Sequence, residues 1–107
     1  MATVIRGESD TSLDAIKAVL DAYELEHPGA VATLYRQNNV SVRIRVVDQR
    51  YKSMSKGERH DDLWSFIAVR LDEDTIQDIS VLLPLAPSEL KSSFMNAEFE
   101  DPMPATY

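Results

Sequence analysis

Residues 53–64, SMSKGERHDDLW, decide how the middle of the chain folds. Ser55 and Glu58 have the spacing of a capping box, in which two side chains bind the first free backbone amides of a helix. The following sequence predicts an amphipathic helix, because its apolar positions recur every three or four residues. The predicted apolar stripe contains His60, Leu63, Trp64, Ile67 and Leu71. Trp64 is therefore expected in the core, and His60 is expected to pack beside it.

Two runs rich in β-branched residues precede this helix, at residues 30–37 (AVATLYRQ) and 40–48 (VSVRIRVVD). The asparagines at positions 38 and 39 tolerate the positive φ angles of a tight turn, so an antiparallel hairpin is predicted. Side chains alternate between the two faces of a strand, and every second residue from position 40 to 46 is apolar. This pattern predicts one buried face and leaves Arg43 and Arg45 on a face that is solvated or contacts a partner.

Three further signals complete the order of elements. A first helix is predicted to begin with Thr11 or Ser12 as its N-cap and to end at the HPG turn. The run ISVLLPL at residues 79–85 is typical of a buried strand, in which Pro84 indicates a sheet edge or the end of the strand. Pro87 is typical of the first position of a final helix.

The order helix–strand–strand–helix–strand–helix predicts an α+β domain with a three-stranded mixed sheet packed against helices. The helix between the second and third strands implies a right-handed parallel crossover. A chain of 107 residues, 44% hydrophobic and 27% charged, has the size and composition of one domain. We expect this domain at residues 11–98, between a flexible N-terminal tail (1–10) and a flexible acidic C-terminal tail (99–107).

The composition excludes several kinds of chemistry. The chain has no cysteine, so disulfides, cysteine nucleophiles and thiolate metal ligands are excluded for the chain by itself. The two histidines stand far apart, so no metal site is predicted. A general base made of His60 and the next aspartate is not expected, because adjacent residues on a helix point in different directions. No P-loop, dinucleotide fingerprint or nucleophile elbow is present, and the protein is not expected to be an enzyme.

No apolar run of the sequence approaches the length of a membrane span, and the first residues lack the apolar core of a signal peptide. The protein is therefore expected to be cytoplasmic, with no membrane partner.

The charges are distributed unevenly along the chain. The formal net charge is −7, yet residues 36–59 contain seven basic and two acidic side chains, a local balance of +5. A basic middle on an acidic chain is a candidate site for an anion or an acidic partner. The alternative is that these side chains pair with neighbouring acidic helices or remain solvated.

Two motifs carry a resemblance to a known family. The segment YKSMSKGERHD places Tyr51 ahead of a capped Arg59-His60 pair, and DISVLLPLAPSEL ends with Pro87 and Glu89. These motifs resemble those of the BolA family, whose fold is similar to class II KH domains. The resemblance covers residues 46–90 and implies a BolA-like, class II KH-like version of the α+β fold.

BolA-like proteins bind monothiol glutaredoxins and can share a [2Fe–2S] cluster with them. The family's ligands are a histidine before the third strand and a histidine or cysteine in the loop joining the first two strands. At these positions this chain has Asp78 and the residues QNN at 37–39. A carboxylate replaces imidazole poorly in a soft cluster site, so direct cluster ligation is not expected and no cofactor is predicted.

The sequence therefore predicts a non-enzymatic protein-binding or regulatory module, which the resemblance links to monothiol glutaredoxin and iron–sulfur or redox regulation. The predicted partner-binding surface consists of Arg43, Arg45, Arg50, Lys52, Lys56, Arg59 and His60. For the Arg59-His60 pair a structural role stays open, in which Arg59 holds the preceding loop or an acidic neighbour. Nucleic-acid binding by residues 36–59 is the alternative function, although the chain lacks a Gly-x-x-Gly loop and its net charge disfavours a polyanion.

Overall fold

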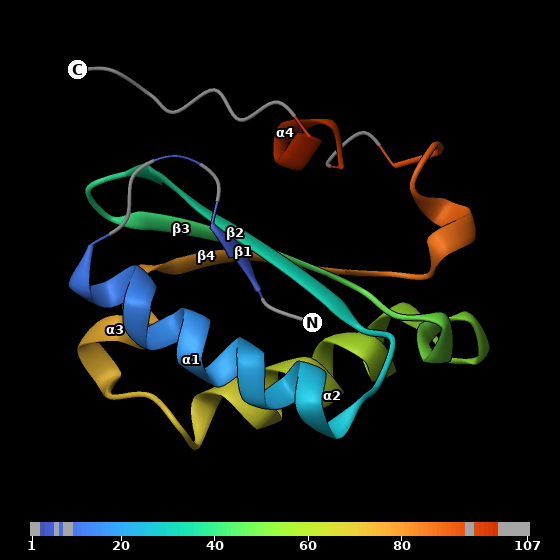
Figure 1. The fold of residues 1–107 in the computed structure, drawn as a ribbon, viewed down its shortest axis with the longest axis horizontal. Helices are drawn as coiled ribbons and strands as arrows, with labels where there is room; N and C mark the ends of the chain where they lie inside the picture. Colours follow the sequence, from blue (N-terminus) through green and yellow to red (C-terminus); the bar gives the residue numbers. More distant parts are fainter. Residues whose placement is uncertain (1–2, 6, 8–9, 94–95, 101–107) are drawn as a thin grey trace.

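The computed structural model describes residues 3–5, 7, 10–93 and 96–100, which form an α+β fold around one four-stranded mixed sheet (Figure 1). The strands are β1 (Val4–Ile5), β2 (Val31–Asn38), β3 (Ser41–Val47) and β4 (Ile79–Leu85). The helices are α1 (Thr11–Glu26), α2 (Lys56–Ala68), α3 (Glu73–Asp78) and α4 (Ala97–Glu100). Two short 3-10 helices are also present: η1 (Gln49–Ser53) precedes α2, and η2 (Pro87–Glu89) follows β4.

The strands lie in the order β1-β2-β3-β4. β2 and β3 are antiparallel, while β3 and β4 are parallel, which confirms the predicted hairpin and the predicted parallel pairing. The hairpin reverses at Asn39 and Val40, and no described residue other than glycine has a positive φ angle. The expected positive-φ asparagine turn is therefore wrong. Val40 belongs to this turn and is 72% exposed, so it does not share the buried face of β3.

The sheet has one strand more than predicted. In β1, Val4 and Ile5 pair in parallel with Thr33 and Leu34 of β2. The Thr3 amide just before them donates to a carboxylate oxygen of Asp21 in α1, at 2.8 Å. These residues were predicted to lie in a flexible tail. A strand of two residues is too short to show a periodic pattern, so the sequence carried no signal for it.

The C-terminal part also differs from the prediction. Pro87 begins the three-residue 3-10 helix η2 rather than a long final helix, and Phe94, expected on that helix, lies outside the described residues. Phe99 and Glu100, expected in the tail, end α4. Phe99 is fully buried and packs edge-on against Tyr35 of β2, with ring centroids 5.5 Å apart. The rest of the predicted acidic tail, residues 101–107, lies outside the described residues.

The N-cap of α1 lies one residue before Thr11, the first of the two predicted caps. Asp10 is the N-cap, and its Oδ1 accepts a hydrogen bond from the Leu13 amide at 2.9 Å. The other oxygen of Asp10 binds the guanidinium of Arg36 at 2.5 Å, so this carboxylate also joins the start of α1 to the end of β2. The predicted end is confirmed: α1 stops at Glu26, and Gly29 follows with φ +98°.

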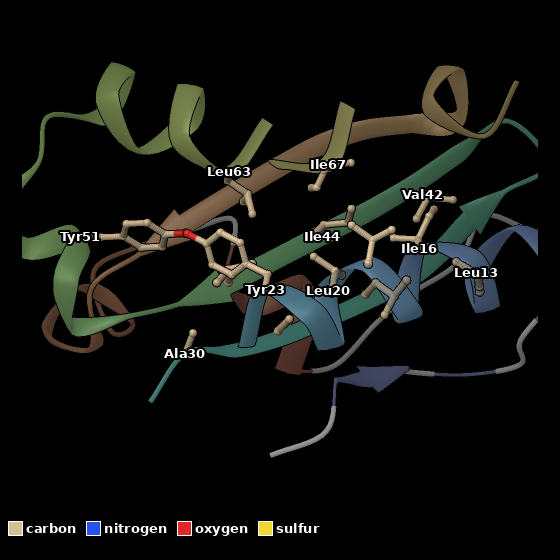
Figure 2. Packing of buried hydrophobic residues seen from close by; sticks show 14 residues of the cluster. Leu13, Ile16, Leu20, Tyr23, Ala30, Val42, Ile44, Tyr51, Leu63 and Ile67 are labelled. Atoms are coloured by element: carbon tan, nitrogen blue, oxygen red, sulfur yellow. The ribbon is translucent and has the colours of Figure 1, made fainter. Parts of the chain in front are cut away.

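The main core lies between the sheet and helices α1 and α2, which cover the same face (Figure 1). Figure 2 shows side chains of both helices meeting those of β3. The predicted alternation in β3 is confirmed from position 42 onward, because Val42, Ile44 and Val46 are fully buried. α4 covers part of the opposite face. β4 lies at one edge of the sheet, which confirms the expectation of an edge strand. Only its last residue, Leu85, is buried, so the expectation of a buried strand is wrong.

Candidate functional site

The capping box predicted at the start of α2 is present. The Ser55 hydroxyl accepts from the Glu58 amide at 3.1 Å, and the Glu58 carboxylate accepts from the Ser55 amide at 2.8 Å. These bonds define the first turn of α2, and therefore the directions in which Arg59 and His60 project.

Arg59 is an internal structural residue. Its side chain is 7% exposed, and its Nη1 and Nη2 atoms donate to the two oxygens of Glu89 at 2.6 and 2.9 Å. Its Nε atom donates to the Met54 carbonyl oxygen at 3.1 Å. The structural alternative for Arg59, that it holds the preceding loop and an acidic neighbour, is thereby confirmed. The same forked bond from Arg59 lowers the pKa of Glu89 to about 2.

The expectation that His60 packs on the apolar stripe is wrong, because His60 is exposed. The buried positions of α2 are Arg59, Leu63 and Ile67, which follow one another every four residues. Successive helix residues are rotated by about 100°, so His60 projects away from this stripe. Trp64, one turn after His60, is half-buried and does not belong to the main core. Leu63 and Ile67 of the predicted stripe are buried as expected, but the buried arginine at position 59 takes the place predicted for His60.

The other predicted basic surface is covered by the chain itself. Arg45 is 7% exposed and donates to the Thr33 hydroxyl at 3.1 Å, to Asn96 at 2.6 Å and to Glu100 at 2.8 Å. Its neighbour Arg43 is half-buried and donates to Gln37 at 2.7 Å. The expectation of an open arginine face is therefore wrong at Arg45. The reason is the contact with Asn96 and Glu100, which the sequence did not predict to fold back onto the sheet.

Arg50 belongs to a polar cluster that joins α1, η1 and α2. Its Nη2 atom donates to Tyr23 at 2.7 Å and to Asp62 at 2.9 Å. The hydroxyls of Tyr23 and Tyr51 are 2.5 Å apart, and Figure 2 shows the two rings meeting end to end. Burial raises the pKa of Tyr23 and raises that of Tyr51 to about 12. Neither tyrosine is a base at neutral pH, and one oxygen of Asp62 accepts from both Tyr23 and Arg50, which supports a structural role for the cluster.

Three lysines remain without a hydrogen bond or ion pair in the described part of the chain: Lys52, Lys56 and Lys91. The other described lysine and the described arginines all bind acidic or polar side chains. The three lysines lie in η1, at the first residue of α2 and just after η2, segments found at the right-hand end of Figure 1. With the exposed His60 they form what we call the basic end. The basic surface predicted from the sequence contains Lys52, Lys56 and His60 but not Lys91, which is distant in sequence.

A cavity of about 680 Å³ adjoins the basic end, between the start of α2 and the outer strand β4. Residues 82–85 of β4 form its apolar side, Lys56 and His60 border it from α2, and the serines at 92–93 border it from the segment after η2. A smaller hollow of about 190 Å³ shares His60 with this cavity and adds Trp64. We call the two together the edge groove.

The two positions at which the resemblance implies iron–sulfur ligands do come close together, beside the β2–β3 turn. The Arg36 Nη2 atom is 3.6 Å from an oxygen of Asp78, and its Nη1 atom donates to the carbonyl oxygens of Asn38 and Asn39, each at 3.2 Å. A guanidinium is a cation that offers no lone pair to a metal. These side chains do not fit a [2Fe–2S] cluster.

Within the described ranges, no three histidine, cysteine, aspartate or glutamate side chains come together in a group that could hold a metal ion. No helix in the same part of the chain has the length and apolar character needed to cross a membrane. No protein-family model, curated protein or solved structure matches this chain.

Proposed function

We propose that the protein is a non-enzymatic binding module, and that a partner protein docks on the basic end beside the edge groove. The observation that carries this proposal is the separation of the cations into two groups. The arginines are held by internal contacts, whereas the described lysines without an internal partner gather with His60 at one end of the molecule. Cations that form no internal hydrogen bond or ion pair and border an apolar groove are suited to an acidic partner surface.

The described residues that line the groove bring together no acid, base and nucleophile in an arrangement suited to catalysis. Its carboxylate, Glu89, is held ionised by Arg59 and is occupied by that forked bond. The groove's serines lie beside no general base, because the only histidine lining it, His60, forms no hydrogen bond to a described residue. General base catalysis requires such a contact within hydrogen-bond reach of the reacting group.

Nucleic-acid binding is the second candidate. It is favoured by the same unpaired lysines, but most of the basic residues counted in positions 36–59 are engaged inside the molecule. Each phosphate contact contributes about 0.7–0.9 to the slope of log affinity against log salt, so the three lysines of the basic end correspond to weak binding at physiological salt. On an acidic chain of net charge −7, this disfavours nucleic acid relative to a protein partner.

The BolA resemblance makes a monothiol glutaredoxin the first partner to test, within a role in iron–sulfur or redox regulation. Anaerobic titration with a cluster-loaded monothiol glutaredoxin, followed by size exclusion and circular dichroism, measures complex formation directly. Because Arg36 lies against Asp78, we expect complex formation without a ligand from this chain to the cluster. A cluster spectrum that changes when Asp78 is replaced by alanine would contradict this expectation.

Site-specific photo-crosslinking in cells that express the protein tests the docking surface for any partner. We place p-benzoylphenylalanine at position 60 in the basic end and, as a matched control, at the exposed position 74 in α3 at the other end of the molecule. The expected result is an adduct to a defined protein at position 60 and none at position 74. The purified partner should then bind the Lys52→Glu/Lys56→Glu variant at least tenfold more weakly than the unmodified chain.

Equal adducts at positions 60 and 74, or no protein adduct at position 60, would overturn the proposal. Adducts to nucleic acid at position 60, lost as salt rises from 50 to 200 mM, would establish the second candidate function.

A further inference from the structure

The shape of β4 limits how the edge groove can be used. The Leu85 carbonyl accepts from the Asp48 amide of the neighbouring chain segment, so the Leu85 backbone faces inward. Backbone groups alternate along a strand, and Leu82 and Pro84 therefore face outward. Pro84 has no amide to donate, and its carbonyl lies 3.5 Å from the Arg59 Nη1 atom. A register shift between positions 79 and 81 interrupts the other end of the edge. Proline and bulges prevent the addition of another strand, so the groove is suited to side-chain recognition.

The apolar side chains of the groove form two adjoining positions. One is the cavity of about 680 Å³ over residues 82–85, and the other is the hollow of about 190 Å³ beside Trp64. His60 and Leu82 line both, so a ligand that occupies one reaches the other. The larger cavity has the volume of known ligand pockets, which is roughly 300–1,000 Å³. Together they have room for apolar side chains of an extended peptide segment.

Lys56, one of the cations that line the groove, stands where helix stability does not favour a positive charge. Lys56 is the first residue of α2, and the helix dipole there stabilises anions rather than cations. It forms no hydrogen bond or ion pair with a described residue. On the opposite wall, Lys91 directly precedes the serines that line the cavity. The groove therefore has an apolar base, with Lys56 and His60 on one side, Lys91 next to the other, and the internally paired Arg59 and Glu89 between them, on a chain whose net charge is −7.

Resting on the proposed function, we infer that the edge groove binds a partner segment that combines apolar and acidic side chains. Its apolar side chains lie against residues 82–85 and Trp64, and its carboxylates meet Lys56, His60 and Lys91. Charge complementarity selects this occupant over a second copy of the chain, since two copies of net charge −7 repel each other. Steering by these cations makes association fast and dependent on salt.

Three capped nine-residue peptides test this inference: one repeats Glu-Glu-Leu, one repeats Lys-Lys-Leu and one repeats Glu-Glu-Ser. Trp64 is the only tryptophan of the chain and lines the groove, so its fluorescence reports occupancy. We expect saturable binding of the Glu-Glu-Leu peptide at low salt. The Lys-Lys-Leu and Glu-Glu-Ser peptides should bind at least tenfold more weakly. In the Lys56→Glu/His60→Glu/Lys91→Glu variant, the preference should shift to the Lys-Lys-Leu peptide.

The inference is overturned if the peptides bind equally, if none binds, or if the charge-reversed variant keeps the original preference. Light scattering separates one further outcome: a concentration-dependent dimer, lost in the charge-reversed variant, would mean that a second copy fills the groove. If crosslinking at position 60 identifies a protein partner while the peptides show no preference, the proposed function stands and only this inference fails. If neither experiment detects binding at the basic end, both fail.

Discussion

The two basic regions of this molecule, the arginines on β3 and the residues at the start of α2, look alike in the sequence and differ in the structure. Arg45 on β3 is buried beneath α4, where Asn96 and Glu100 accept its hydrogen bonds. At the start of α2, Lys56 and His60 border an open groove. The difference shows that a local excess of positive charge does not by itself locate a binding surface. What decides availability is whether another part of the same chain supplies the counter-charge.

Within α2 the same contrast occurs between adjacent residues. Arg59 is fixed by Glu89 and the Met54 carbonyl, while His60 forms no hydrogen bond with the described residues. Arginine suits the internal position because its planar fork matches a carboxylate and its long apolar stem packs along the core. The predictions that follow test how sharply the internal and the open cations differ.

The largest effect is expected for Arg59→Ala. Removing one partner of a buried ion pair costs about 3–5 kcal/mol, and because Glu89 is 35% exposed we expect about 2–4 kcal/mol here. Urea unfolding of Arg59→Ala, Glu89→Ala and the double variant measures the coupling. The double variant should be less destabilised than the sum of the two single variants. Strict additivity would mean that the pair contributes no coupling and that Arg59 stabilises only through packing and its bond to the Met54 carbonyl.

Arg45→Ala is expected to cost about 1–3 kcal/mol, because the buried Asn96 and Thr33 lose their donor and the contact with Phe99 is lost. Amide hydrogen exchange in α4 should become faster in the same variant. Arg70→Ala is the matched control, since Arg70 is 40% exposed and its ion pair with Glu26 is 4.0 Å long. An exposed pair of this kind contributes about 0–1 kcal/mol. An equal loss of unfolding free energy in the two variants would mean that the buried Arg45 and the exposed Arg70 do not differ in their contribution to stability.

These contacts explain which features could be predicted from the sequence. The capping box of α2 and the alternation of β3 from Val42 onward depend on residues close in the chain, and both were predicted correctly. The burial of Arg45 depends on Asn96, 51 residues away, and that of Arg59 on Glu89, 30 residues away. No periodic pattern reports such pairs. For the same reason the groove was not predicted: its sides come from α2, β4 and the segment after η2.

Trp64→Ala tests whether the outer face of α2 is surface or core. The sequence placed Trp64 in the core, where truncation costs about 3–5 kcal/mol. Because Trp64 is half-buried and lines the smaller hollow, we expect about 1–2 kcal/mol by burial of part of its apolar area. Leu63→Ala is the control, as Leu63 is fully buried and should lose about 2–5 kcal/mol. A loss for Trp64 equal to that for Leu63 would place Trp64 in the core after all.

The ion pair of Arg59 predicts a specific dependence of stability on acid. The pKa of Glu89 falls from its ordinary value of 4.5 to about 2 in the folded protein, since Arg59 stabilises the ionised form. The stability that the ionised Glu89 adds to the folded protein is fully present above about pH 4.5 and is lost as the pH falls through about 2. Urea unfolding from pH 5 to pH 2 should show a shallower fall for Glu89→Gln than for the unmodified chain. Parallel curves for the two proteins would mean that Glu89 does not titrate as this geometry requires.

The smallest effect on stability is expected for Lys56→Glu, a substitution that should nevertheless weaken binding. Lys56→Glu replaces a cation by an anion at the first position of α2, where an anion is favoured by about 0.3–1 kcal/mol. Proximity to Glu89, whose pKa Lys56 helps to lower, offsets part of this gain, so the net change in unfolding free energy should stay within about 0.5 kcal/mol. Binding of the Glu-Glu-Leu peptide should nevertheless weaken at least threefold. A variant that unfolds more easily and binds unchanged would show that Lys56 serves the fold, and that the open cations do not differ in role from the covered arginines.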